Sequence, residues 1–368
     1  MLTRGRFATR MLAMTAAALL AASPVRAQDA GTGFDGLAAQ AAAARDQGNL
    51  SRAIELYGKA EELKPEWTEG WWNIGLMQYS ANQYAPAIEA FNHLLAIEPH
   101  TAPAMAVRGL CEFETGGFDD SLRDLEQAVA HGAANDAQHG PILRYHLGIL
   151  LTRAGRYIDA MAQYKVLAGK HVEMAELPLA IGMAGMRVKG LPGDVMEQDR
   201  PLYEAAGKAA SALLDDNSKG ADTAFRELFA RYPETRSLHY FYGMLLFPHD
   251  RGMAVEQFER EVALDPSNEL ATALLAFTLM YVGRYREAVP VAERAVAASP
   301  GMELAQLALG RSLIETGQEQ RGMELLNQVL EHNPESLEAH VGLAAAYARA
   351  GRKEDAYRER MVCLGLAG

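Results

Sequence analysis

The stretch Glu66–Pro99, EWTEGWWNIGLMQYSANQYAPAIEAFNHLLAIEP, recurs in altered form along most of the chain. Its glycine at 75 has a counterpart 34 residues later at Gly109, and Pro99 has one 34 residues earlier at Pro65. The same step links four small residues in the second half of the chain, Ala254, Ala288, Gly322 and Ala356. A fixed period of about 20–50 residues is the sequence signature of a protein built from stacked repeats.

Each repeat is predicted to be two helices joined by a short turn. Small residues such as Gly75 and Ala87 mark where the two helices approach most closely, and large residues such as Phe91 are expected to fill the gap to the next repeat. Glycine is expected at most of the turns, since a helix often ends in a left-handed residue, and Asn82 takes that place in the second repeat. Proline closes repeats, as at Pro99, because a helix cannot continue through it.

The spacing of Trp71, Ile74, Gly75, Tyr84, Ala87, Phe91 and Pro99 resembles the tetratricopeptide repeat family, a helix-turn-helix of about 34 residues. The resemblance extends over nearly the whole chain after residue 33. It implies an all-α fold, a right-handed α-solenoid of about nine repeats whose first helices line a concave groove that usually holds proteins or peptides. One subtype of the family clamps a terminal carboxylate with Lys and Asn in this groove. That subtype is not expected, because the corresponding positions here are Trp72 and Leu76, Ala106 and Leu110, and Tyr145 and Ile149.

The repeats fall into two predicted arrays. The first covers residues 34–171 with about four repeats, and the second covers residues 201–368 with about five. Between them the period fails, and residues 172–200 are predicted to be one irregular apolar helix and a connector. So apolar a helix is not expected to be left in water, which favours a packed joint over a hinge. Arg358 and Arg360 stand where a further repeat would pack, as expected for a terminal cap.

Residues 1–27 have the pattern of a secretory signal peptide. Three basic residues, Arg4, Arg6 and Arg10, are followed by a mostly apolar run over residues 11–22. Val25 and Ala27 then occupy positions −3 and −1 of the expected cleavage site. About a dozen apolar residues are too few to span a bilayer, so no stable membrane anchor is expected. The protein is therefore predicted to be periplasmic or secreted, with residues 28–33 as a short mobile tail.

The charge of the chain argues against nucleic acid as a partner. Formal net charge is −12, and removal of residues 1–27 takes away four arginines and no acid, which brings it to −16. Such a charge repels phosphates.

Cys111 and Cys363 fall in distant repeats and are expected to be two free thiols.

Sequence patterns of enzymes are missing from the chain. HExxH, GxSxG, CxxC and EF-hand loops do not occur. Six histidines between positions 93 and 171 have no helical spacing of three or four residues, so neither a metal nor another cofactor is expected. An enzyme built on residues 172–200 is disfavoured because no nucleophile–base pair appears there.

Ten positions on the first helices are predicted to face the groove and bind a partner, since aromatic residues and Arg are enriched at binding hot spots. They are Trp72, Tyr79, Phe113, Tyr145, Arg153, Tyr240, Phe247, Phe277, Tyr281 and Arg311. The competing interpretation is that several of these aromatics only pack neighbouring helices and that Arg153 and Arg311 are solvated rather than functional.

The leading hypothesis is therefore an exported, non-enzymatic scaffold that holds a protein or peptide of the cell envelope. The alternative is a binder of a small ligand, glycan or lipid that uses the same aromatic residues. The sequence leaves the oligomeric state and the identity of the partner open.

Overall fold

The computed structural model describes residues 31–214 and 218–366, and all regular structure in these ranges is helical. The described residues form nineteen α-helices and two short 3-10 helices, and they contain no strand. The predicted signal peptide and residues 28–30 of the predicted tail lie outside these ranges, while residues 31–33 are exposed. The chain divides into two compact units, Met1–Pro201 (unit 1) and Leu202–Gly368 (unit 2).

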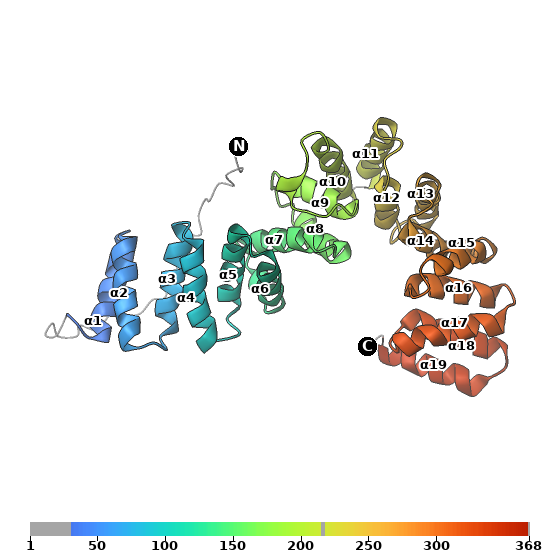
Figure 1. Ribbon diagram of the computed structural model, residues 1–368. Coiled ribbons are helices and arrows are strands. Elements are labelled where there is room, and N and C mark those ends of the chain that lie inside the picture. The colour runs from blue at the N-terminus through green and yellow to red at the C-terminus, as the bar shows by residue number, and fades with distance from the viewer. Residues whose placement is uncertain (1–30, 215–217, 367–368) are drawn as a thin grey trace. The chain divides into compact units, whose positions relative to one another are not determined.

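Unit 1 contains four helical hairpins and one further helix. Each helix contacts the next along the chain, so that the hairpins are stacked in sequence order (Figure 1). In chain order the helices are α1 Phe34–Asp46, α2 Leu50–Leu63, α3 Thr68–Ser80, α4 Tyr84–Ile97, α5 Ala102–Thr115, α6 Phe118–Ala130, α7 Gly140–Arg153, α8 Tyr157–Gly169 and α9 Leu177–Gly185. The 3-10 helices are η1 Ala133–Asn135 and η2 Pro192–Asp194.

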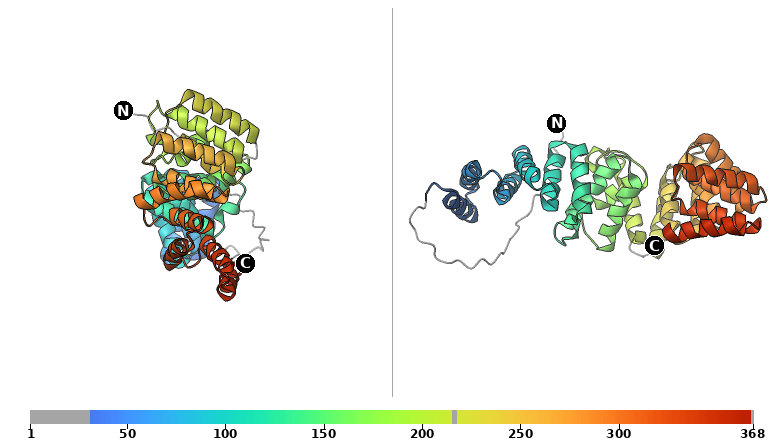
Figure 2. Two further views of the ribbon diagram at one scale, coloured as in Figure 1. Left: turned by 90° about the vertical axis from the view of Figure 1, so that its right-hand side faces the viewer. Right: turned by 90° about the horizontal axis from the view of Figure 1, so that it is seen from below.

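Unit 2 continues the same construction. Its helices are α10 Arg200–Leu214, which begins just before the unit boundary, α11 Ser218–Arg231, α12 Leu238–Leu246, α13 Arg251–Leu264, α14 Glu269–Tyr281, α15 Tyr285–Ala298, α16 Glu303–Glu315, α17 Glu319–His332, α18 Leu337–Arg349 and α19 Lys353–Leu366. From α12 onward these form four hairpins, each packed on the next (Figure 2). First helices of neighbouring hairpins also touch, as α14 touches α16 and α16 touches α18.

The 34-residue period places a small residue of the first helix against a large one of the second. A Cβ atom at Gly75 would lie 2.7 Å from the ring of Phe91, and one at Gly243 would lie 2.7 Å from the ring of Phe258. Both rings are completely buried. A side chain at either glycine would therefore force the two helices apart, which confirms the prediction that small residues mark their closest approach.

The large residues also reach the next hairpin, as predicted. A Cβ at Gly310 of the same hairpin would lie 2.8 Å from Leu326, and one at Gly342 of the following hairpin would lie 2.6 Å from it. The turns have the expected backbone, since Asn82 has φ 58° and the turn glycines have φ between 73° and 92°, at Gly48, Gly116, Gly155, Gly283, Gly317 and Gly351.

The segment 172–200 is not one long helix followed by a plain connector. Residues 172–176 are non-helical, and α9 starts at Leu177 with Pro178 in its first turn, where the missing N–H is tolerated. Eight of the nine residues of α9 are buried, and the helix packs against α7 and α8. The expectation that so apolar a helix is covered is confirmed, although the helix is shorter than predicted.

The last described helix is not the polar cap that Arg358 and Arg360 suggested. Only one of the fourteen residues of α19 is buried, and several of its apolar side chains are exposed. None of the helices formed by residues 31–214 and 218–366 is long and apolar enough to cross a membrane.

Candidate functional site

The predicted groove residues of unit 1 are largely used in packing. Trp72 on α3 is half-buried, and its ring meets that of Phe91 edge-on at 5.8 Å between centroids. Tyr79 at the other end of α3 is also half-buried, and burial raises its pKa to about 12. Phe113 on α5 packs edge-on against Phe118 of the next helix, at 5.6 Å between centroids.

Tyr145 on α7 is only 7% exposed, so its prediction as a groove residue is wrong. Burial raises the pKa of its hydroxyl, and Glu176 and Arg200 lie close enough to influence that pKa. These two charged residues form an ion pair at 2.8 Å and belong to the non-repeat segment that follows α8. Chain that the repeat pattern does not describe therefore passes close to this buried position.

Arg153 at the end of α7 is exposed and packs locally. Its guanidinium lies 3.1 Å from the Asp119 carboxylate and 4.7 Å from the centroid of the Phe118 ring. Both partners are at the start of α6, so the arginine links neighbouring hairpins.

Tyr240 on α12 is also buried, at 4% exposure, and its prediction as a groove residue is wrong as well. Its ring lies 6.5 Å from that of Phe258 on α13, and its backbone N–H donates to the Glu261 carboxylate at 3.1 Å. Because this position lies in the first turn of a short helix, the second helix of the hairpin holds it in the core.

Unit 2 does bring three of the predicted residues together in one accessible group. Phe247, Phe277 and Tyr281, here called the aromatic cluster, have ring centroids separated by 6.1, 5.9 and 4.9 Å. Phe247 and Phe277 are half-buried and Tyr281 is 36% exposed. The guanidinium of Arg251 lies over two of the rings, 5.5 Å from the centroid of Phe247 and 5.1 Å from that of Tyr281.

The surface continues from α14 across α16 to α18. The Tyr281 hydroxyl donates to Glu338 on α18 at 3.3 Å, although the two residues are 57 positions apart. Arg311 on α16 is half-buried and lies against Gly342, where a Cβ would come 3.0 Å from its Cγ. Val341 on α18 is 41% exposed. Burial raises the pKa of Tyr281, and the Glu338 carboxylate adds to this while Arg311 and Arg251 oppose it.

Three residues of this surface were missed by sequence reasoning. Val341 stands three residues before Ala344, the small residue of its helix, which is the register of Tyr145 and Tyr240. It is neither aromatic nor Arg, the residue types that mark binding hot spots in a sequence. Arg251 follows the shortened turn between α12 and α13, so the repeat pattern gives it no groove position. Glu338 is recognised only through its contact with Tyr281.

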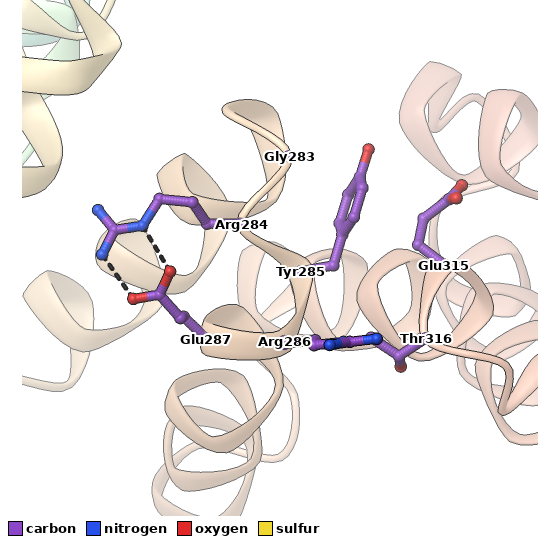
Figure 3. Close-up of a pocket in the computed structure, with 7 residues that line it drawn as sticks. All are labelled: Gly283, Arg284, Tyr285, Arg286, Glu287, Glu315 and Thr316. Atoms are coloured by element: carbon purple, nitrogen blue, oxygen red, sulfur yellow. Dashed lines mark hydrogen bonds and ion pairs between the residues drawn. The ribbon is translucent and has the colours of Figure 1, made fainter.

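A hollow elsewhere in unit 2 lacks the apolar character of the aromatic cluster. It lies where the turn between α14 and α15 meets the end of α16, and it is lined by Gly283, Arg284, Tyr285, Arg286, Glu287, Glu315 and Thr316 (Figure 3). Its charges are largely paired, since Arg284 donates to Glu287 at 2.6 Å and Arg349 donates to Glu315 at 2.8 Å. We therefore place the candidate site on the aromatic cluster and its extension. Within the described residues, no group of three or more His, Cys, Asp or Glu side chains is placed to hold a metal ion.

Stacked helical hairpins with an accessible aromatic surface on their first helices define a helical repeat protein of the kind that binds other proteins. Family models described as tetratricopeptide repeat match residues 38–101, 108–171, 279–331 and 317–359, which together make up more than half of the chain. The chain belongs to the tetratricopeptide repeat family. Proteins of this family generally mediate protein–protein interactions and are typically non-enzymatic.

Individual similar proteins share modest identity with this chain. The TPR repeat-containing protein MJ1428 of Methanocaldococcus jannaschii is 28% identical over 119 residues, which are 32% of this chain and 20% of that protein. The chain thus matches about a fifth of the length of that relative. Among solved structures, MamA from Desulfovibrio magneticus RS-1 is 22% identical with a TM-score of 0.41, covering 45% of this chain and 94% of MamA. Yeast Tom70 is 15% identical with a TM-score of 0.31, covering 91% of each chain.

Proposed function

We propose that this chain is an exported, non-enzymatic scaffold that holds a protein or peptide of the cell envelope on the first-helix surface of unit 2. The observation that carries the proposal is the accessible aromatic cluster, extended by Arg311 and Val341 over three consecutive first helices. Folding leaves these apolar groups partly in water, where a partner can still bury them.

The chemistry of the surface fits a peptide segment with apolar side chains. Aromatic rings offer flat contact area at little cost in side-chain entropy, and they are frequent among the residues that dominate binding energy. The Tyr281 hydroxyl, Glu338 and Arg311 supply polar groups around the cluster. An extended or helical segment that places apolar residues on the rings and polar groups beside them suits such a surface.

Export is the second part of the proposal, and it is supported by the pattern of residues 1–27. Cell fractionation combined with N-terminal sequencing tests it. We expect the mature protein to begin at Gln28 and to be found outside the cytoplasm. A cytoplasmic protein that retains Met1 would contradict export while leaving the binding surface untouched.

Affinity capture from native envelope extracts tests the binding surface. We expect the double variant Tyr281→Ala with Val341→Glu to retain less than about a tenth of the partner captured by the wild type, since two anchors of about 1 kcal/mol or more are lost. The control is Leu63→Ala on α2, which removes a side chain of comparable exposure outside the surface. Equal capture by wild type and double variant would reject the site.

The same variants separate the protein-binding proposal from a small-ligand binder. All three tryptophans, at 67, 71 and 72, lie in unit 1, so calorimetry is a better readout for unit 2 than tryptophan fluorescence. Heat of binding from sugars or lipids that disappears in the double variant, with no captured protein, would favour the small-ligand alternative.

A further inference from the structure

Helix α19 carries an exposed apolar stripe beside the face that packs on α18. Its inner face carries the buried Ala356 and the half-buried Glu359, whose carboxylate lies 2.6 Å from a ring nitrogen of His340 on α18. The adjoining face carries the stripe, Tyr357, Met361 and Leu364, which are 63%, 47% and 67% exposed. Their spacing of four and then three residues places them on one face of the helix, in the arrangement of a coiled-coil seam.

The preceding hairpin shows what normally happens to this face. Tyr357 and Leu364 stand 34 residues after Met323 and Leu330 of α17. Those two side chains are half-buried and pack in a cluster with Leu343 of α18, the helix that follows. Tyr357 and Leu364 are therefore at positions that a following helix covers elsewhere in unit 2, whereas Met361 stands at the position of the exposed Asn327.

A single helix is sufficient to provide such a cover. In unit 1 the second helix of the last hairpin, α8, is packed against α9, which has no partner of its own in a hairpin. The sequence of α9, LPLAIGMAG, contains no charged residue, and the helix is almost completely buried.

A helix that packs on the stripe of α19 must carry different charges from α9 and α18, the helices that cover α8 and α17. Arg360 stands at the position of the buried Leu326, and Lys353 stands at that of Glu319. Both cations are exposed, both border the stripe on the same side, and within the described residues neither forms an ion pair. A purely apolar helix over the stripe would bury the Arg360 charge without an ion-pair partner, at a cost on the order of several kcal/mol.

We propose that the stripe of α19 is a docking site for an amphipathic helix of a partner protein, with apolar residues against Tyr357, Met361 and Leu364 and carboxylates against Lys353 and Arg360. A second copy of α19 fits less well. In a symmetric antiparallel pair the flank that carries Lys353 and Arg360 would face itself, and like charges would meet. The site is separate from the aromatic cluster and does not depend on the function proposed for it.

Two synthetic helical peptides test this docking site. They share length and a leucine seam, and differ in carrying Glu or Lys at the positions that flank the seam. Binding to the full chain is measured by fluorescence anisotropy at low salt. We expect the Glu peptide to bind at least tenfold more tightly than the Lys peptide, and Met361→Glu to weaken its binding at least tenfold. Arg360→Glu should remove the preference, because the flank would then carry one cation and one anion.

Matched variants and two further measurements complete the test. Ile158→Glu on α8, where the isoleucine is 70% exposed, controls for any added charge at an exposed apolar residue and should leave binding unchanged. Circular dichroism confirms that the variants are folded. Three results would overturn the proposal. They are equal affinity of the full chain for both peptides, an unchanged preference of Arg360→Glu for the Glu peptide, and loss of Glu-peptide binding in Tyr281→Ala. So would a dimer, seen by sedimentation, that Met361→Glu dissociates, because a second copy would then be the occupant. Anionic lipid vesicles that bind through the stripe while the Glu peptide does not would overturn it as well.

Discussion

Tyr145 in unit 1 and Tyr281 in unit 2 were both predicted to face the groove, yet one is buried and the other accessible. Tyr145 is covered where the non-repeat segment with Glu176 and Arg200 passes close to α7. Tyr281 contacts the Glu338 carboxylate, the rings of Phe247 and Phe277 and the Arg251 guanidinium, and it keeps 36% of its surface exposed. A position on a first helix therefore does not by itself determine whether a side chain can bind.

The two regions differ in the elements that pack on their first helices. In unit 1 a further helix, α9, packs against α7 and α8. In unit 2 the neighbours of α14 on this surface are α16 and α18, which present Arg311 and the small Gly342. Small and extended side chains leave the rings of α14 open, so accessibility is a property of the neighbouring repeats.

The largest effect expected from this comparison is on stability. Tyr145→Ala should lower the free energy of unfolding by about 3–5 kcal/mol, the range for removing a buried aromatic side chain. Tyr281→Ala should lower it by less than about 1 kcal/mol, because its ring is already partly in water. Urea unfolding followed by circular dichroism measures both. Equal losses would show that the two tyrosines are similarly buried and would remove the basis of the comparison.

The second effect contrasts two buried glutamates, Glu61 on α2 and Glu261 on α13. Burial raises the pKa of Glu61 to about 7, against the lowering effect of the Trp71 backbone N–H. The folded state thus holds this proton more tightly than the unfolded chain, whose glutamate pKa is about 4.3. Stability contributed by Glu61 is present below that value and is lost as the pH rises toward and through 7.

Glu61→Gln should therefore raise the free energy of unfolding at pH 8 by about 1–3 kcal/mol and change it little at pH 4. Glu261→Gln should instead lower it at both pH values, by about 1–2 kcal/mol. The reason is that the two Glu261 oxygens accept the backbone N–H groups of Ser237 at 2.7 Å and Tyr240 at 3.1 Å. Urea unfolding at the two pH values provides the test, and a stabilising effect at pH 8 from both substitutions would contradict it.

The third effect concerns binding and is smaller. Tyr281→Ala alone should weaken partner binding about five- to tenfold, corresponding to about 1–1.4 kcal/mol. Trp72→Ala should change it less than about twofold, since the indole packs on Phe91 in unit 1. Affinity capture or calorimetry with the identified partner checks both, and a stronger effect from Trp72 would move the site to unit 1.

The sequence predicted what depends on contacts inside one repeat. Gly75 against Phe91 and the left-handed turn at Asn82 follow from residues a few turns apart, which the 34-residue period displays directly. It could not predict which ring stays accessible. Tyr145 is buried near residues 31 and 55 positions away that belong to no repeat, and Tyr281 meets a carboxylate 57 positions away. Such contacts leave no periodic signal in a single sequence.

The smallest effects are expected from the two arginines predicted for the groove. Arg153 pairs with Asp119, which is 94% exposed, so Arg153→Ala should cost no more than about 0.5 kcal/mol and even less at high salt. Arg311→Ala should cost about 1 kcal/mol regardless of salt, because its Cγ and Cδ atoms lie against the backbone of α18 at Gly342 and packing is lost along with charge. Unfolding measurements at low and high salt separate the two mechanisms. If the loss of unfolding free energy in Arg311→Ala disappeared at high salt, the Arg311 side chain would act only as a surface charge. The aromatic cluster would then have no packed arginine at its border with α18.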